Sequence, residues 1–478
     1  GYISSLIVAI SAFGASPELL AYAHAKALLL IFDVLLIIWA AFLLYRVADE
    51  AGAIQTIVQA LPHLTPDRGM QALIIGWLFA SFLQGVGGFG VPVAVIAPIM
   101  IGLGFPPLSA VVIPSIGHSW AVTFGSMGSS FNALLAATNL SAELLAAPTA
   151  FFLGVACLFV GMMVAHAAGG WAAFRRLLIP VLILGIIMGT VQFLVVTSGP
   201  WNLGAFIASM AGLLVAFPLA YLTQKESKID GRLNIPAVLI ALSAYIILIV
   251  VTLLIQLIPS VKVWLSGFEI RVFFPDISTT LGFVTKAGPG RVIPFFRHAG
   301  VILVYTSILA YIVYKLAGLY KPRAIQRILD GTLRRVMSSS VSIASMVTMS
   351  VIMQHAGMTD TIARGFAGVI GALYPAVAPW IGALGAFMTG SNTNSNVVLG
   401  ALQLRTAELI GYSVAIILAA QTAGASMGSV IAPTKVVVGS STAGMAGHEG
   451  IVMRKLFVYT GLLILIISFL AMVCLRIL

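Results

Sequence analysis

The sequence predicts an all-α polytopic membrane protein made of two repeats that contain broken helices. Composition is the first observation behind this prediction, because 60% of the 478 residues are hydrophobic and only 8% are charged, against about 25% charged in a soluble domain. So few charges cannot cover the surface of a water-soluble chain of this length. We therefore expect a multi-pass protein of the cell membrane, embedded in the lipid bilayer. The second observation is a helix-breaking pattern that occurs once in each half of the chain.

Apolar stretches of about 20 residues, the length that crosses the hydrocarbon core of a bilayer, recur along the chain. We expect spanning helices at 27–45, 149–167, 177–196, 203–222, 235–258, 299–319 and 452–473. Residues 1–26 hold only a short apolar stretch, which we interpret as a partial N-terminal span.

Two polar, glycine-rich segments interrupt this apolar sequence. The first break, residues 82–90, reads Phe-Leu-Gln-Gly-Val-Gly-Gly-Phe-Gly, and the second break, residues 387–396, reads Phe-Met-Thr-Gly-Ser-Asn-Thr-Asn-Ser-Asn. Downstream of each break comes a Ser-Met-Gly-Ser segment, at 126–129 and again at 426–429. The shared order predicts two repeats, at 27–145 and 330–446. Paired interruptions at equivalent positions of two halves indicate the binding site of a transporter.

The rest of the chain is more uniformly apolar. We expect residues 149–319 to form a middle block of scaffold spans with a long extracytoplasmic loop at 259–298, and residues 452–478 to form a C-terminal span. The net charge of +11 does not indicate nucleic-acid binding, because the basic residues lie at span ends. By the positive-inside rule, the loops that carry these residues lie in the cytoplasm: Arg175, Arg176, Lys225, Lys228, Arg232, Lys321, Arg323, Arg327, Arg334 and Arg335.

Each break must be shielded from lipid, since an unpaired backbone N–H or C=O in hydrocarbon costs several kcal/mol. Where a broken helix restarts, its free N–H groups and partial positive charge favour an anion. The alternative is that the small residues only permit close helix packing. The substrate-binding candidates are Gly87, Gly88, Phe89, Gly90, Ser391, Asn392, Thr393, Asn394, Ser395 and Asn396 in the breaks, with Ser126 and Ser426 in the Ser-Met-Gly-Ser segments.

Three ionisable residues lie in or beside the apolar segments, where such residues are rare and often functional. Lys435 follows the second Ser-Met-Gly-Ser segment and either pairs with a substrate carboxylate or snorkels from a span end. His118 lies close to the first such segment, and it either carries a coupling proton or is a neutral packing residue. Asp33 is either a tie between helices or part of a proton path.

Other classes of function receive less support. The chain holds no Walker G-x-x-x-x-G-K-[ST] sequence and no H-E-x-x-H sequence, so neither an ATP-driven pump nor a zinc-dependent intramembrane hydrolase is indicated. We expect no enzyme activity, no cofactor and no metal site. An anion channel is less favoured than a carrier, because a channel would more simply be built from repeated subunits around one pore.

At these motifs the chain resembles the lactate permease family of bacterial and archaeal secondary carriers. The matching stretches are residues 82–92, 102–108, 124–128, 389–396 and 401–403, and they cover both repeats in order. The resemblance implies a symporter that takes up L-lactate and related small 2-hydroxy-monocarboxylates such as glycolate together with a proton. It also implies the ion-transporter superfamily, with inverted repeats, two re-entrant hairpins, an elevator-type transport domain and a scaffold that forms a homodimer.

One residue of the first break departs from the better-known family members, which carry a glutamate where this chain has Gln84. A glutamine side chain cannot titrate, so a coupling proton would need another carrier, and His118 is our first choice. Otherwise sodium is the coupling ion, since Ser, Asn and Thr oxygens and unwound carbonyls suit a hard cation. The segment 425–435 also departs from the family pattern, so the resemblance specifies the substrate less firmly than the family.

Overall fold

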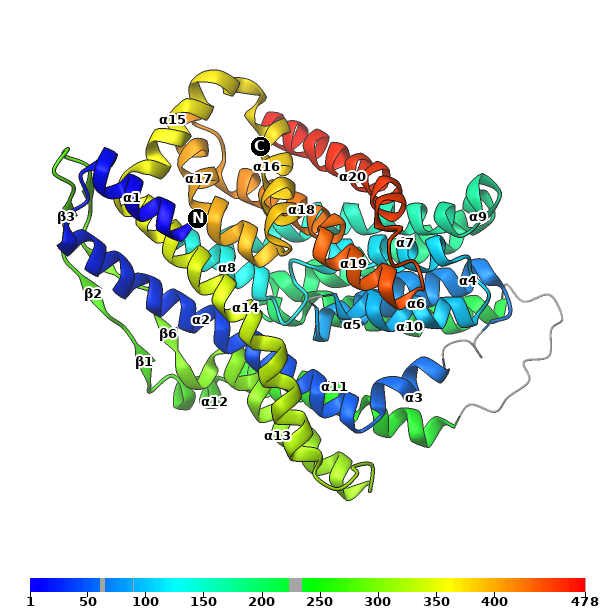
Figure 1. Cartoon of the computed structure of the whole chain (residues 1–478). Coiled ribbons are helices and arrows are strands. Elements are labelled where there is room, and N and C mark those ends of the chain that lie inside the picture. The colour runs from blue at the N-terminus through cyan, green and yellow to red at the C-terminus, as the bar shows by residue number, and fades with distance from the viewer. Residues whose placement is uncertain (61–64, 89, 223–233, 478) are drawn as a thin grey trace.

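The computed structural model describes residues 1–60, 65–88, 90–222 and 234–477. The chain is mainly helical (Figure 1), and within these residues ten helical segments are long and apolar enough to cross a membrane. They are Pro17–Glu50, Arg68–Val86, Ala142–Thr197, Trp201–Tyr221, Ile235–Ile255, Ala299–Leu316, Ala324–His355, Met358–Thr389, Val414–Ile431 and Glu449–Ile477. The prediction of a helical, multi-pass membrane protein is confirmed.

The structure describes twenty α-helices. In the first half they are α1 (Tyr2–Phe13), α2 (Pro17–Glu50), α3 (Ala53–Ala60), α4 (Arg68–Leu73), α5 (Ala80–Val86), α6 (Val91–Gly102), α7 (Pro107–Gly117), α8 (Ser129–Thr138), α9 (Ala142–Thr197) and α10 (Gly204–Leu222). In the second half they are α11 (Ile235–Leu257), α12 (Pro259–Leu265), α13 (Ala299–Leu316), α14 (Ala324–His355), α15 (Met358–Ile370), α16 (Tyr374–Thr389), α17 (Asn392–Ile410), α18 (Val414–Gly428), α19 (Pro433–Thr442) and α20 (Glu449–Ile477). A π-helical turn, Ile74–Phe79, joins α4 to α5.

The loop between α12 and α13 is a narrow antiparallel ribbon. Its nested pairs are β1 (Glu269–Ile270) with β6 (Ile293–Pro294), β2 (Phe273–Phe274) with β5 (Gly288–Pro289), and β3 (Ile277–Ser278) with β4 (Val284–Thr285). The ribbon runs along the left side of Figure 1, whereas α3 and α4 lie on the right.

Two helices differ from the spans that the sequence predicts. α2 begins at Pro17, inside the residues expected to form a separate N-terminal span, because proline fits a first helical turn and the Ser16 hydroxyl accepts a backbone hydrogen bond at 3.1 Å. The spans expected at 149–167 and 177–196 are two arms of α9. The arms meet at a bend where Gly170 has a φ of 65°, a conformation that glycine adopts at little cost.

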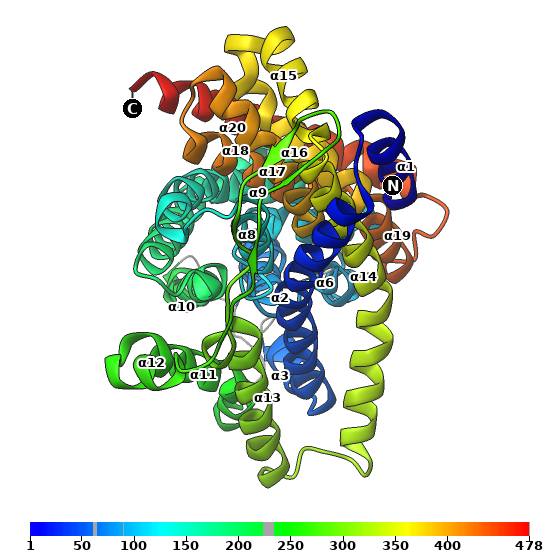
Figure 2. The same cartoon turned by 90° about the vertical axis from the view of Figure 1, so that its left-hand side faces the viewer.

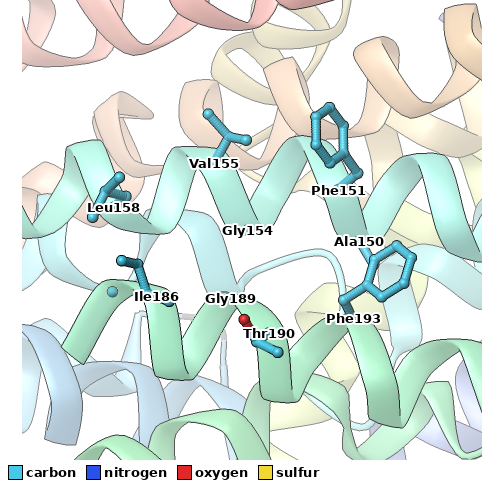
Figure 3. A pocket seen from close by; sticks show the side chains of 10 residues that line it. Ala150, Phe151, Gly154, Val155, Leu158, Ile186, Gly189, Thr190 and Phe193 are labelled. Carbon is cyan, nitrogen blue, oxygen red and sulfur yellow. The ribbon is translucent and has the colours of Figure 1, made fainter. Parts of the chain in front are cut away.

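The two arms of α9 approach closely at Gly154 and Gly189, where a Cβ atom on Gly154 would lie 3.4 Å from the Gly189 Cα. A groove of about 400 Å³ lies between the arms, with Phe151 and Ile186 among its lining residues (Figure 3). Among the side chains labelled in Figure 3, only Thr190 carries an oxygen. This apolar groove cannot compensate a carboxylate, so it is unsuited to an anionic substrate.

The helices of the expected middle block, α9 to α13, do not lie together. α11, α12 and α13 lie at the bottom of Figures 1 and 2, far from α15 to α18 and α20, which lie at the top. α9 and α10 pack instead against α4, α5 and α18. Glycines permit this contact, because a Cβ on Gly69 would lie 2.7 Å from Leu177 Cδ1 and one on Gly85 would lie 2.9 Å from Phe206 Cα. Part of the expected scaffold therefore packs with the repeats.

Each repeat shows the same order of elements around two interruptions. In the first repeat, α5 and α6 flank the first break, and α7 and α8 flank residues 118–128. In the second, α16 and α17 flank residues 390–391, and α18 and α19 flank residues 429–432. The packing crosses between the repeats, since α17 packs against α8 and α6 packs against α19. Each helix that follows a break thus lies against the last helix of the other repeat.

The two Ser-Met-Gly-Ser segments differ in conformation. Ser126, Met127 and Gly128 have φ values of 48°, 55° and 69°, whereas residues 426–428 belong to α18. The N–H groups of Ser126 and Met127 donate to the carbonyls of Gln84 at 2.8 Å and Gly85 at 3.2 Å. The left-handed turn therefore docks on the end of α5, which lies within the first break. Positive φ at two non-glycine residues is strained, and such strain clusters at functional sites.

Candidate substrate-binding site

The interruptions of both repeats meet at one small internal cavity. It is lined by Gln84, Val122, Ser126, Ser129, Ser130, Gly390, Ser391, Asn392, Thr393 and Lys435. The space open to the centre of a water molecule is about 20 Å³, which is room for a water. The structure thus brings parts of the first break, the second break and the first Ser-Met-Gly-Ser segment together, with Lys435 beside them.

Two helices begin at this cavity. α17 begins at Asn392, directly after the lining residues Gly390 and Ser391, and α8 begins at the lining residue Ser129. Each N-terminus carries roughly half a positive charge and is suited to an anion. The sequence indicates the start of α17, but it does not single out the start of α8. The run Gly128-Ser129-Ser130 could have indicated the start of α8, because glycine and serine are typical of helix N-termini.

A third helix begins beside the first break. α6 starts at Val91, and the preceding Gly90 has a φ of 86°. A Cβ atom placed on Gly90 would lie 4.0 Å from Lys435 Cγ. A Cβ atom placed on Gly88, which has a φ of 54°, would overlap the Ser126 hydroxyl. Both backbone conformation and space therefore require glycine at position 88, which brings the first break into contact with Ser126.

Hydrogen bonds between the repeats hold the two sides of the cavity together. The hydroxyls of Ser130 and Thr393 lie 3.0 Å apart, and the Asn396 amide donates to the Ser130 carbonyl at 2.9 Å. The Asn392 amide donates to the Thr123 hydroxyl at 3.0 Å. Sequence reasoning missed Ser130 and Thr123, because isolated serines and threonines occur throughout membrane helices and only the fold makes them partners.

Several buried amide oxygens in the breaks have no hydrogen-bond partner among the described residues. They are the Oδ1 atoms of Asn392, Asn394 and Asn396 and the Oε1 atom of Gln84. An oxygen of this kind cannot bond a carboxylate oxygen, but it can accept a hydrogen bond from a hydroxyl group or coordinate a hard cation. Of these four residues, Asn392 and Gln84 line the cavity.

Lys435 supplies the positive charge at the cavity. It lies in the first turn of α19, half-buried, and its Nζ donates to the Ser429 hydroxyl at 3.2 Å. None of the ion pairs in the described part of the chain involves Lys435. Lys435 therefore lies at the cavity with a hydroxyl partner and without a carboxylate partner among the described residues. Ser429 was missed as a candidate, although it ends the second Ser-Met-Gly-Ser segment.

Other candidates do not line the cavity. His118 is fully buried at the end of α7, where its Nδ1 donates to the Pro114 carbonyl at 2.6 Å and its Nε2 has no partner among the described residues. Ser426 donates to the Ser119 carbonyl at 2.6 Å, and Ser395 donates to the carbonyl of Gly382 at 2.8 Å.

Four more candidates complete the set. Asn394 and Asn396 are buried on α17 but do not line the cavity, and Gly87 packs against the Tyr45 ring, where a Cβ atom would lie 3.2 Å from Cδ2. Phe89 lies outside the described residues.

Asp33 lies away from this cavity, in the middle of α2. Its carboxylate accepts hydrogen bonds from Arg291 Nε at 2.9 Å and from His298 Nε2 at 2.8 Å. These bonds connect α2 to the end of the β-ribbon and to the start of α13, as the interpretation of Asp33 as a structural tie predicts.

Comparison with known proteins gives a consistent result. The model of the L-lactate permease family matches residues 1–478. A putative L-lactate permease of Haemophilus influenzae is 27% identical, over 88% of this chain and 82% of that protein. The L-lactate permease of Bacillus subtilis is 28% identical, over 89% of this chain and 82% of that protein. The glycolate permease GlcA of Escherichia coli is 25% identical, over 96% of this chain and 87% of that protein. Among solved structures, the YdaH transporter of Alcanivorax borkumensis has a similar fold, with a TM-score of 0.51 and 16% identity, over 96% of this chain and 89% of that chain.

Proposed function

Because the chain belongs to the L-lactate permease family, we propose that it is a secondary carrier of L-lactate and related 2-hydroxy-monocarboxylates such as glycolate. The names of its relatives, L-lactate permease and glycolate permease, support this class of substrate. The observation that carries the proposal is Lys435, a cation without an acidic partner among the described residues, at a cavity where α8 and α17 begin.

The substrate's two functional groups match two parts of the cavity. Its carboxylate would lie against the N-termini of α8 and α17 and the Lys435 ammonium, because a buried anion needs charge and hydrogen-bond donors to offset lost hydration. Its 2-hydroxyl would donate to the unpartnered Asn392 Oδ1. A site built to bond a hydroxyl strongly rejects analogues that lack it, because its polar group is then left unpaired.

Transport would require movement, since the cavity as it stands has room for a water but not for lactate. We propose that the two repeats are inverted, that α5–α6 and α16–α17 are re-entrant hairpins, and that the repeats move as an elevator-type transport domain. The crossed packing of α17 on α8 and of α6 on α19 supports this arrangement. The scaffold, with α11 to α13, would then form the homodimer interface.

The coupling ion is a proton in the first form of this proposal. Gln84 lines the cavity but cannot titrate, so His118, with its unpartnered Nε2, is the candidate carrier. Sodium is the second form, and it is favoured by a separate observation, the unpartnered amide oxygens of Asn392, Asn394 and Asn396 on α17. Both forms are symport of the monocarboxylate with a cation.

Proteoliposomes that contain the purified protein test the proposal. We expect saturable uptake of labelled L-lactate, accumulation above equilibrium when a proton gradient is imposed, and competition by glycolate but little competition by propionate. Accumulation driven only by a sodium gradient would replace the proton form with the sodium form. No lactate uptake under either gradient would refute the proposed substrate, and non-saturable, gradient-independent flux would indicate a channel.

A further inference from the structure

A second polar cavity lies next to the proposed substrate site. Its volume is about 400 Å³, within the range of small-molecule pockets, and it lies between α2, the junction of α9 with α10, and the end of the β-ribbon. The ribbon belongs to the loop that the positive-inside rule places outside the cytoplasm. This cavity is therefore on the extracytoplasmic side.

Positive charge is available in this cavity. Five lining residues are titratable: Asp33, Glu143, Arg291, Arg297 and His298. Asp33 already accepts hydrogen bonds from Arg291 and His298. Glu143 is exposed in the first turn of α9, where the helix N-terminus favours its charge. Arg297 has no ion-pair partner among the described residues, and its Nε is buried without a hydrogen-bond partner there.

The two cavities share the first turns of α8 as a wall. Ser129 and Ser130 line the substrate cavity, whereas Asn132, on the same helix, lines the extracytoplasmic cavity. Trp201 Nε1 donates to Asn132 Oδ1 at 3.1 Å. A Cβ atom on Gly128 would lie 3.1 Å from the Asn202 Cα. The barrier between the cavities is therefore thin, formed by one helix turn and the Trp201–Asn132 contact.

We infer that the extracytoplasmic cavity is an entry subsite for the transported carboxylate, with Arg297 as the residue that binds the anion. This inference rests on the proposed function. Arg291 offsets the charge of Asp33 and Glu143 is exposed to solvent, so Arg297 is the lining arginine without an ion-pair partner among the described residues. A partly buried cation of this kind raises the local concentration and the association rate of an oppositely charged ligand. Anions would reach Arg297 first and would then pass α8 toward Lys435 when the Trp201–Asn132 contact opens.

The test compares Arg297→Gln, Arg297→Lys and a matched control in sided membrane vesicles. The control is Arg271→Gln, because Arg271 lies in the same loop, is exposed, pairs with Glu269 at 3.2 Å and does not line the cavity. At low ionic strength we expect Arg297→Gln to raise the apparent KM for L-lactate entering from the extracytoplasmic face roughly tenfold. The maximal rate of uptake and the KM at the cytoplasmic face should not change, whereas the maximal rate of efflux should fall in the same proportion, because a substitution cannot alter the equilibrium of the transported solutes. Arg297→Lys should restore most of the affinity, and Arg271→Gln should behave as the wild type.

The outcomes separate this inference from its alternatives. An unchanged KM in Arg297→Gln, or an equal rise at both faces, would overturn the entry subsite while wild-type lactate uptake upholds the proposed function. Absence of lactate uptake in the wild type would overturn both. Measurements in vesicles of phosphatidylcholine alone exclude an anionic lipid headgroup as the ligand of Arg297. If the KM of Arg297→Gln differs from that of the wild type only when anionic lipid is present, the inference is overturned. A difference that persists in phosphatidylcholine alone and becomes smaller at high salt supports the inference.

Discussion

Replacing Lys435 by methionine tests the charge balance of the substrate cavity. Methionine keeps a long, flexible side chain that fills space but removes the ammonium that lies beside the start of α19. The Ser429 hydroxyl, which accepts a hydrogen bond from Lys435 Nζ at 3.2 Å, would lose this donor. The helix N-termini at Ser129 and Asn392 would remain. We therefore expect partial rather than complete loss of anion affinity.

The magnitude follows from the half-buried position of Lys435. A hydrogen bond to a charged group contributes about 1.5–3 kcal/mol, and tenfold in affinity corresponds to about 1.4 kcal/mol. Lys435→Met should therefore weaken the apparent affinity for lactate by about tenfold to a hundredfold. The full Coulomb energy of two charges 4 Å apart near a protein surface, about 4 kcal/mol, is an upper bound, because the bound anion keeps the helix termini as partners.

The assay is the concentration dependence of labelled L-lactate uptake into proteoliposomes. The matched control is Lys455→Met, since Lys455 is exposed on α20, over the Tyr459 ring at 5.5 Å, and does not line the cavity. Lys435→Arg, which retains the charge, should keep more affinity than Lys435→Met. Wild-type affinity in Lys435→Met would refute the reasoning and identify Lys435 as a snorkelling residue, with the helix termini alone holding the anion.

Two further predictions concern coupling and the first break. If transport is proton-driven, His118→Ala should abolish gradient-driven accumulation of lactate. Gln84→Glu should retain transport, with the same or a shifted pH profile. Proton-driven accumulation that persists in His118→Ala would rule out His118 as the proton carrier. Gly88→Ala should lower the uptake rate at least tenfold, because a Cβ atom there overlaps the Ser126 hydroxyl at a φ of 54° and such strain costs about 1–3 kcal/mol. Gly102→Ala, at a helical position with open space around it, is its control, and equal rates in the two variants would contradict the steric argument.

The breaks are readable from the sequence because they depend on local chemistry. A run such as Gly87-Gly88 or Ser391-Asn392 disfavours a continuous helix in any fold, and hydrocarbon tolerates no unpaired backbone. Lys435 can be singled out for a similar reason, since a lysine in an apolar segment either has a functional partner or reaches the aqueous phase. Six of the fifteen candidate residues line the cavity: Gln84, Ser126, Ser391, Asn392, Thr393 and Lys435.

What the sequence does not reveal is set by tertiary contacts. His118 is near Ser126 along the chain, but the structure holds its ring at the end of α7, bonded back to the Pro114 carbonyl and outside the cavity lining. Ser130 and Thr123 gain their roles only because α8 packs against α17. Identical Ser-Met-Gly-Ser sequences adopt different backbones, and the left-handed turn of the first donates hydrogen bonds to the carbonyls of Gln84 and Gly85.

The contacts across the cavity restrict how a substrate could enter. Moving the repeats apart would break the Ser130–Thr393, Asn396–Ser130 and Asn392–Thr123 hydrogen bonds. Each contributes about 0.5–1.5 kcal/mol when made and costs more when a buried partner is left unpaired. A rigid movement of both repeats against the scaffold would keep all three bonds, with the cavity opening at a hairpin tip or at the Trp201–Asn132 contact. The hydrogen bonds thus favour the elevator-type movement of the proposal over a separation of the two halves.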